Sequence, residues 1–268
     1  MRMDVVELQN FYSHTDLGKK IAKIINKTLN PLMSSNSCEF IIGFGFTCPF
    51  MKPFIRMSSL KVNSPKIITL MPGEQGVIPW PKNKKNVSVL VDETSWPINT
   101  SSADIILIAH GLEVSGNQDD LLNEAFRVLD GKGKLILLVP NRTGFWARSD
   151  LTPFGFGRPY SISQLSKLLI ENKFKILNTN ATLLMPPTKK TFLFNSFKFI
   201  DQIAAKYTSK VMGGVLVILA KKQIHLANTI KISDSIKVPL EIFDGFIKPK
   251  PKPQPKICNY LKKTSQML

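Results

Sequence analysis

Residues 104–113 read DIILIAHGLE, and residues 122–140 read LNEAFRVLDGKGKLILLVP. The first stretch is a short apolar run that ends at His110 and is followed by a glycine, which is typical of a buried strand. The second has apolar residues at helical spacing up to Leu129, then a Gly-Lys-Gly turn and another apolar run over 134–139. A strand, a helix and a strand in this order predict an α/β unit with parallel strands.

The same alternation extends over most of the chain. The expected strands cover residues 38–43, 66–71, 87–91, 104–109, 134–139, 174–177 and 214–221. The expected helices cover residues 15–30, 119–129 and 161–171. Asp119 is expected to cap the second helix, while Ser161 and Gln164 form a capping box for the third. The pattern therefore predicts a mainly parallel, seven-stranded sheet with helices on both faces.

The charge is distributed unevenly along the 268 residues. The chain carries 36 Lys and Arg against 19 Asp and Glu, a net charge of +17, which suggests an anionic partner such as nucleic acid. Residues 221–268 hold ten lysines against three acids, and 249–256 read PKPKPQPK, which cannot form a regular helix. We therefore expect a folded domain over 1–222, with its sheet core over 38–221. The basic tail over 223–268 is expected to be mostly irregular, either solvated or in weak contact with RNA or another polyanion.

The composition also restricts the class of protein. Hydrophobic residues make up 43% of the chain, enough for a substantial core. Three unpatterned cysteines, Cys38, Cys48 and Cys258, argue for a reducing compartment and against a disulfide framework or a metal site. No segment reaches the roughly 18 uninterrupted apolar residues of a membrane span, and the first residues lack the apolar core of a signal peptide. The expected location is the cytoplasm.

A glycine-containing turn, GFGFT, follows the first expected strand at residues 43–47. Glycines at this position allow a tight turn and a close approach of the backbone to a ligand. The dinucleotide fingerprint requires a further glycine at position 48, which is Cys48. The turn therefore argues against a nicotinamide cofactor, and it is also compatible with a tight turn that binds no ligand.

An ordered series of motifs follows this turn. Asp92 and Glu93 come after the third expected strand, His110 follows the fourth, and Glu124 lies one helical turn before Arg127, with which it is expected to pair. This series resembles the class I S-adenosylmethionine-dependent methyltransferases. The resemblance implies a Rossmann-like fold of that class and S-adenosylmethionine as the cofactor.

A narrower resemblance rests on the segments MPGEQG at 71–76 and VPNRTGFWAR at 139–148. These are similar to a methyltransferase-domain family of alphaproteobacteria that is uncharacterised as to substrate. The narrower resemblance therefore implies no particular methyl acceptor.

The resemblance to methyltransferases also implies a cofactor site at the ends of the first four strands. Its residues would be Gly43, Phe44, Gly45, Thr47, Met71, Glu74, Asp92, Glu93 and His110. Gly43 and Gly45 would lie beneath the methionine part of the cofactor. Asp92 would accept a hydrogen bond from the adenine amino group, and Glu93 would offer a main-chain amide to the ring. His110 would border the transferred methyl group and is the candidate catalytic base, although a packed histidine fits the sequence equally well.

Three positions depart from the usual pattern of these enzymes. The acid that commonly lies two residues before the first glycine is replaced by Ile41, and the third glycine is Thr47. The acid that commonly ends the second strand and binds both ribose hydroxyls is replaced by Met71, with Glu74 as the nearest carboxylate. Loss of such a carboxylate weakens binding by about 1.5–3 kcal/mol unless Glu74 replaces it. A catalytically inactive methyltransferase-like binding module is therefore an alternative.

The long segment 141–161 follows the fifth expected strand, where loops commonly bind ligands. We expect it to bind the substrate through Asn141, Arg142, Trp146, Arg148, Arg158 and Tyr160. Arginine binds carboxylates and phosphates in a planar fork, so the acceptor is expected to be anionic or planar. Alternatively, Arg142 and Arg148 pair with acids such as Asp150, and Trp146 is packed in the core.

The leading hypothesis is thus an S-adenosylmethionine-dependent methyltransferase that acts on an unidentified acceptor. A catalytically inactive binding module is the alternative, and an RNA-binding or RNA-modifying protein is the third. The charge motivates the third hypothesis, but outside the 141–161 segment no basic cluster with interleaved aromatics supports it.

Overall fold

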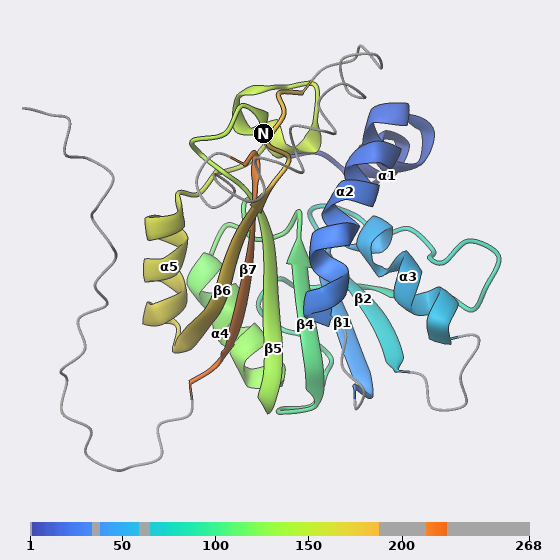
Figure 1. The fold of residues 1–268 in the computed structure, drawn as a ribbon. Coiled ribbons are helices and arrows are strands. Elements are labelled where there is room, and N and C mark those ends of the chain that lie inside the picture. Colours follow the sequence, from blue (N-terminus) through green and yellow to red (C-terminus); the bar gives the residue numbers. More distant parts are fainter. Residues whose placement is uncertain (1, 34–37, 59–64, 188–212, 224–268) are drawn as a thin grey trace, which may run out of the picture. The chain divides into compact units, whose positions relative to one another are not determined.

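The computed structural model describes residues 2–33, 38–58, 65–187 and 213–223 (Figure 1). Its helices are α1 (Val5–His14), α2 (Asp16–Met33), α3 (Cys48–Ser58), α4 (Gln118–Val128) and α5 (Ile162–Glu171), with short 3-10 turns η1 (Trp146–Arg148) and η2 (Pro153–Gly155). Its strands are β1 (Phe40–Gly45), β2 (Lys66–Pro72), β3 (Ser88–Val91), β4 (Ala103–Ala109), β5 (Leu129–Pro140), β6 (Phe174–Thr182) and β7 (Val215–Lys222).

The seven strands of the described chain form one sheet in the order β3-β2-β1-β4-β5-β7-β6. The first five are parallel to one another, and β7 lies antiparallel between β5 and β6. The register of β1 with β4 pairs Gly45 with Ala109, so the glycine turn lies beside the end of β4. The mainly parallel seven-stranded sheet predicted from the sequence is therefore confirmed.

Helices cover both faces of this sheet (Figure 1). Side chains alternate along β1, so that Ile41 lies in one core with residues of α1, α2 and α3, and Ile42 lies in the other with residues of α4 and α5. Because the inner strands β1, β4 and β7 are covered on both sides, they are mostly continuous apolar runs, which explains why their positions could be predicted. This arrangement confirms the two-faced α/β architecture.

The first helix was not among the expected elements. Asp4 caps α1 by accepting from the Glu7 backbone, and the Glu7 side chain in turn accepts from the Asp4 backbone. This reciprocal capping box, followed by buried Leu8 and Phe11, is a recognisable start signal that the sequence prediction missed. The following helix, α2, is close to the expected 15–30.

Two local expectations were wrong. Asn117, not Asp119, caps α4; the Asp119 carboxylate instead accepts a hydrogen bond from Asn172. The Gly-Lys-Gly turn at 131–133 is part of the long strand β5, with an irregular register where Leu129 pairs with Ala103. A Cβ at Gly133 would lie 2.9 Å from the Ala103 carbonyl oxygen, so glycine is needed for close packing against β4.

The capping box of Ser161 with Gln164 at the start of α5 is confirmed. The basic tail, apart from Gln223, lies outside the described residues, so the domain boundary at 222 stays a prediction. Cys38 and Cys48 are free thiols, and burial raises the pKa of Cys48 to about 12.

Candidate functional site

The strand order of the sheet reverses at β1. From β1 it continues to β2 and β3 on one side, and then crosses to β4 and β5 on the other. In open α/β sheets, ligands bind outside the carboxyl ends of the strands at such a switch point. The residues that follow β1, β2, β3 and β4 are therefore the candidate site.

The glycine turn at the end of β1 is packed tightly by the protein's own atoms. Gly45 has a φ of 79°, and a Cβ there would lie 2.4 Å from the Ala109 carbonyl oxygen. A Cβ on Gly43 would lie 2.1 Å from Oγ1 of Thr47, a fully buried side chain. Local packing thus suffices to explain both glycines, whether or not a ligand lies above them.

Two other expected cofactor residues point into the cores. Phe44 stacks on Trp96 with ring centroids 5.0 Å apart, on the α4 and α5 side of the sheet. Met71 is fully buried in the core formed with α1, α2 and α3. Because both side chains are packed in the cores, these two residues could contact a ligand only through their main-chain atoms.

A hollow of about 550 Å³ lies at the carboxyl ends of β2 and β3. Its lining comprises Gly73, Glu74, Leu90, Val91, Asp92, Glu93 and Thr94. Leu90 is 52% exposed and supplies an apolar wall, while the acids supply hydrogen-bond acceptors. The fold therefore brings together three of the acids that the sequence assigned to the cofactor.

Asp92 is already held in a local turn. Its Oδ1 accepts from the Thr94 amide at 2.8 Å and from the Thr94 hydroxyl at 2.7 Å. These two hydrogen bonds lower the pKa of the exposed Asp92 carboxyl. The side chain is thus an ionised acceptor with its second oxygen, Oδ2, outside this turn.

Glu93 takes part through its side chain, which was not anticipated. Its Oε2 accepts from the Ser115 hydroxyl at 2.9 Å and from the Gly116 amide at 3.3 Å. Its Oε1 lies 3.2 Å from Nη2 of Arg2, whose Nη1 lies 2.8 Å from Oε2 of Glu74. Arg2 was missed by the sequence prediction, and no motif around it would have indicated its role.

His110 follows β4, as expected, but it is only 3% exposed and is not part of the hollow's lining. Its Nε2 lies 2.7 Å from the Tyr12 hydroxyl, and its Nδ1 lies 3.3 Å from Oε1 of Glu113. Burial, and secondarily the charge of Glu113, raises the pKa of Tyr12, so its hydroxyl keeps its proton and forms a hydrogen bond with Nε2 whose direction depends on the tautomer of His110.

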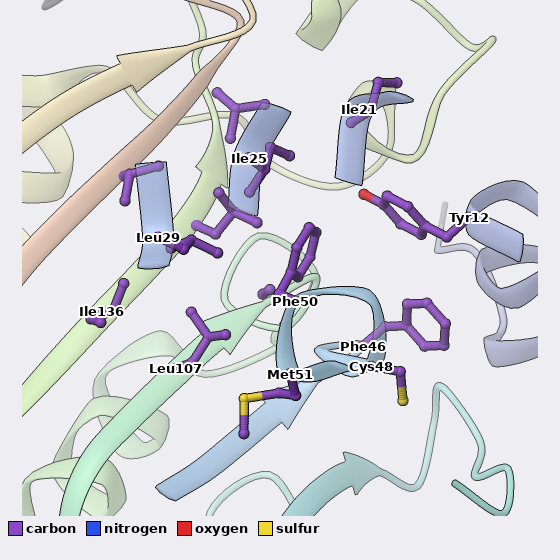
Figure 2. Close-up of a cluster of buried hydrophobic side chains, with 14 of the residues drawn as sticks. Tyr12, Ile21, Ile25, Leu29, Phe46, Cys48, Phe50, Met51, Leu107 and Ile136 are labelled. Carbon is purple, nitrogen blue, oxygen red and sulfur yellow. The ribbon is translucent and has the colours of Figure 1, made fainter. Parts of the chain in front are cut away.

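Tyr12 reaches this position from α1 through an aromatic cluster. Its ring stacks on Phe46 at 6.0 Å and meets Phe50 edge-on at 5.6 Å. Figure 2 shows the tyrosine beside both rings, with apolar side chains of α2 nearby. The 141–161 segment also contacts His110, because the centroid of the Phe154 ring lies 5.0 Å from that of the His110 ring.

Several buried polar side-chain atoms close to the strand ends have no hydrogen-bond partner in the described part of the chain. Among the described residues, neither carboxylate oxygen of Glu113 has a partner in hydrogen-bonding geometry, and neither do Oε1 of Gln75 and Oγ1 of Thr47. Gln75 donates its Nε2 to the His110 carbonyl at 2.9 Å. These acceptors would be satisfied by a ligand that carries N–H or O–H donors.

Three of the expected substrate residues are engaged in the fold. Asn141 donates Nδ2 to the Gly213 carbonyl at 2.6 Å, and Trp146 donates Nε1 to the Met185 carbonyl at 2.5 Å. Tyr160 is buried, with its hydroxyl 3.4 Å from the Leu112 carbonyl. The alternative of a packed Trp146 agrees with this arrangement, and burial raises the pKa of Tyr160 to about 12.

The three arginines of the same segment, Arg142, Arg148 and Arg158, are exposed. Within the described part of the chain, no ion pair joins any of them to a carboxylate, so the alternative pairing with Asp150 is not observed. The exposed side chain of Phe145 lies in the same segment. The arginines therefore remain candidates for binding an anionic acceptor.

The expected pairing of Glu124 with Arg127 is confirmed as a structural contact. Arg127 donates Nε to Oε2 of Glu124 at 2.8 Å and Nη2 to Oε1 at 2.7 Å, and it also donates to the Trp96 and Ile98 carbonyls. Glu124 further accepts from the Trp96 amide at 2.7 Å. The pair thus fastens the loop after β3 to α4.

No protein-family model matches the sequence, and no curated protein matches it either. Solved structures do match the fold. An S-adenosylmethionine-dependent methyltransferase of Thermotoga maritima, described as a possible histamine N-methyltransferase, has a TM-score of 0.57 at 16% identity and covers 82% of this chain and 96% of its own. One from Archaeoglobus fulgidus has a TM-score of 0.54 at 15% identity and covers 82% and 100%. The chain has the class I methyltransferase fold. At these identities the likeness establishes the fold alone.

The methyltransferase fold implies S-adenosylmethionine, and the hollow fits the adenosine part of that molecule. Adenosine offers amino and hydroxyl donors, which match the carboxylates of Glu74 and Asp92, and an apolar ring, which matches Leu90. The volume lies within the range of about 300–1,000 Å³ that is typical of small-molecule sites.

No helix in the described residues has the length and hydropathy of a membrane span. They also contain no group of three His, Cys, Asp or Glu side chains placed to hold a metal ion.

Proposed function

We propose that the protein is an S-adenosylmethionine-dependent methyltransferase. The observation that carries this proposal is the hollow at the ends of β2 and β3, with Glu74, Asp92 and an exposed Leu90 around it. It lies in the class I methyltransferase fold, at the strand ends where that fold family is expected to bind the nucleoside.

In this proposal the Glu74 carboxylate accepts from the ribose hydroxyls and replaces the acid missing at Met71. Asp92 accepts from the adenine amino group with Oδ2, while Thr94 holds Oδ1. Leu90 packs on the ring. When bound, the cofactor would supply an electrophilic methyl group on a sulfonium sulfur, which would keep the electron pair of the broken carbon–sulfur bond.

The protein's part in the reaction is mainly alignment and exclusion of water. A base is needed only if the acceptor is protonated at working pH. His110 is our proposed base, but because its Nε2 is bonded to the Tyr12 hydroxyl and Phe154 packs against its ring, it reaches an acceptor only after the Tyr12 contact opens and the Phe154 segment moves. Until then the Tyr12 and Glu113 contacts hold its ring.

Calorimetric titration with S-adenosylmethionine and S-adenosylhomocysteine tests the proposal. We expect binding of one equivalent with a dissociation constant between about 1 µM and 1 mM, the usual range for enzyme substrates. Absence of binding heat with both compounds, for a protein shown by circular dichroism to be folded, would reject it.

We further propose that the acceptor carries an anionic group beside an apolar portion. Support comes from the exposed Arg142, Arg148 and Arg158 and from two exposed apolar side chains in the same segment, Phe145 at 61% and Leu151 at 49%. Incubation of cell extracts with methyl-labelled cofactor should place the label in compounds that bind an anion exchanger and partition into organic solvent. Label found only in cationic or neutral compounds would contradict this choice.

A catalytically inactive binding module is the second candidate. It is favoured by Met71 at the end of β2, where an acid is expected, and by the enclosed position of His110. This candidate predicts binding of an adenosine-containing ligand without methyl transfer to any extract fraction. Recovery of methyl-labelled product that depends on the protein would exclude it.

A further inference from the structure

Arg2 contacts residues that follow three different strands. Its guanidinium meets Glu74 after β2 at 2.8 Å and Glu93 after β3 at 3.2 Å, and it also donates Nη2 to the Val114 carbonyl after β4. The side chain is only 17% exposed, so these contacts are largely shielded from solvent. One side chain thereby connects the loops after β2, β3 and β4.

The backbone holds Arg2 in this place. The Val5 amide donates to the Gln75 carbonyl at 2.9 Å, and the capping box of Asp4 with Glu7 fixes the start of α1. Gln75 in turn donates to the His110 carbonyl. The residues on either side of the Arg2–Glu74 contact are therefore anchored independently of that contact.

Arg2 stands beside the hollow without entering it. The hollow is lined by Glu74 and Glu93 but not by Arg2. The arginine thus contacts two of the acids of the hollow without being part of its lining. This arrangement favours support of these acids over occupation of the ligand's place.

Glu74 needs such support because of where it lies. It follows β2 in a turn rather than ending the strand, and its side chain is 79% exposed. An exposed carboxylate on a turn samples several rotamers. The hydrogen bonds that it makes to a ligand must offset the conformational entropy lost when one rotamer is fixed. Arg2 engages Oε2 and leaves Oε1 outside this ion pair. It also compensates the repulsion between Glu74 and Glu93.

We propose that Arg2 is a positioning residue: it holds Glu74 in the orientation that accepts the ribose hydroxyls and so substitutes for the acid that β2 lacks at Met71. This inference rests on the proposed adenosine site. It assigns Arg2 no contact with the ligand, and Glu93 serves as the second anchor of the guanidinium.

The test compares two ligands that differ by one hydroxyl, S-adenosylhomocysteine and its 2′-deoxy analogue. Calorimetry measures both with the unmodified protein, Arg2→Ala, Arg2→Lys and Glu74→Gln. Lys167→Ala is the matched control, because it removes one positive charge from the exposed face of α5. Unfolding temperatures without ligand show that each variant is folded.

We expect Arg2→Ala to weaken binding of S-adenosylhomocysteine about tenfold, the effect of one hydrogen bond to a charged group, and binding of the deoxy analogue, which keeps the 3′-hydroxyl, by a smaller factor. Arg2→Lys should recover only part of the affinity, because an ammonium group cannot bridge two carboxylates as a guanidinium does. The double variant with Glu74→Gln should bind no more weakly than Glu74→Gln alone.

Three results for Arg2→Ala would overturn this assignment and leave the proposed function intact. They are equal weakening of both ligands, unchanged binding of both, and tighter binding, which would mean that Arg2 competes with the ligand. Failure of the unmodified, folded protein to bind either ligand would instead reject the proposed function and this assignment with it.

Discussion

Tyr12, His110 and Glu113 form a chain of buried polar side chains in which the middle residue depends on both neighbours. The Tyr12 hydroxyl forms a hydrogen bond with Nε2 of His110 at 2.7 Å, and Nδ1 lies 3.3 Å from Oε1 of Glu113. A buried ring nitrogen that loses its partner keeps the cost of desolvation without the compensating bond. The chain therefore stabilises the fold as well as the position of His110.

Removal of the Tyr12 hydroxyl tests this dependence. Tyr12→Phe should lower the free energy of unfolding by about 1–3 kcal/mol, because Nε2 of His110 is left buried and unpaired. Equilibrium urea unfolding measures the change. Tyr160→Phe is the matched control and should cost about 0.5 kcal/mol or less, since its hydroxyl lies 3.4 Å from its acceptor. Equal losses in the two variants would contradict the account.

A substitution at Gly45 tests the packing of the glycine turn at residues 43–47. Gly45→Ala should destabilise the protein by at least about 2 kcal/mol, because φ is 79° and the new Cβ would lie 2.4 Å from the Ala109 carbonyl oxygen. Gly116→Ala, with no atom within 4 Å of the added Cβ, should change stability by about 0.5 kcal/mol or less. Both values come from urea unfolding, and a neutral Gly45→Ala would refute the stated packing.

For individual residues, the sequence predicted which acids lie at the site but not which residues bind and orient them. Glu74, Asp92 and Glu93 lie around one hollow because parallel strands end at one edge. The contacts of Arg2 with Glu93 and of Tyr12 with His110 join residues 91 and 98 positions apart. Such pairings depend on how α1 packs against the sheet, and no local pattern encodes that.

Among the elements, α4 and the loop after β3 are joined by the Glu124–Arg127 pair. The two parallel hydrogen bonds from Arg127 and the bond from the Trp96 amide hold the pKa of Glu124 below its ordinary value. Since this loop begins at Asp92, the pair also limits movement of one side of the hollow.

The depressed pKa of Glu124 predicts a pH dependence of stability. Its contribution is present above the unfolded pKa of about 4.3 and is lost as the pH falls through the lower folded value. Between about pH 6 and about pH 3.5, the unmodified protein should therefore lose more stability than Glu124→Gln, as measured by urea unfolding. Glu171→Gln, at an exposed pair on α5, should follow the unmodified protein. Identical slopes for all three would contradict the assignment.

The inner strands β1, β4 and β7 were predictable because both faces of the sheet are covered there and these strands are apolar runs, whereas β6 continues through polar residues to Thr182, beyond the expected 177. α1 was missed, although Asp4 and Glu7 carry a capping signal. The Gly-Lys-Gly segment was assigned to a turn because glycine commonly ends elements, whereas here Gly133 permits close contact between β5 and β4. The presence of glycine alone did not distinguish a turn from close packing of two strands.

For the folded part of the molecule as a whole, the layered sheet places the loops after β2, β3 and β4 at a common edge. Arg2 connects them from the start of the chain, and the 141–161 segment brings Phe154 against His110. The central claim is that the hollow at this edge binds adenosine.

Hydrogen exchange with and without S-adenosylhomocysteine tests that claim most directly. Peptides that contain residues 73–76 and 90–94 should exchange more slowly when the ligand is present, because it closes the hollow that they line. Peptides of α5, on a helix outside the hollow's lining, should serve as the unaffected reference. Binding that leaves 73–76 and 90–94 unprotected, or that protects another region instead, would contradict the claim.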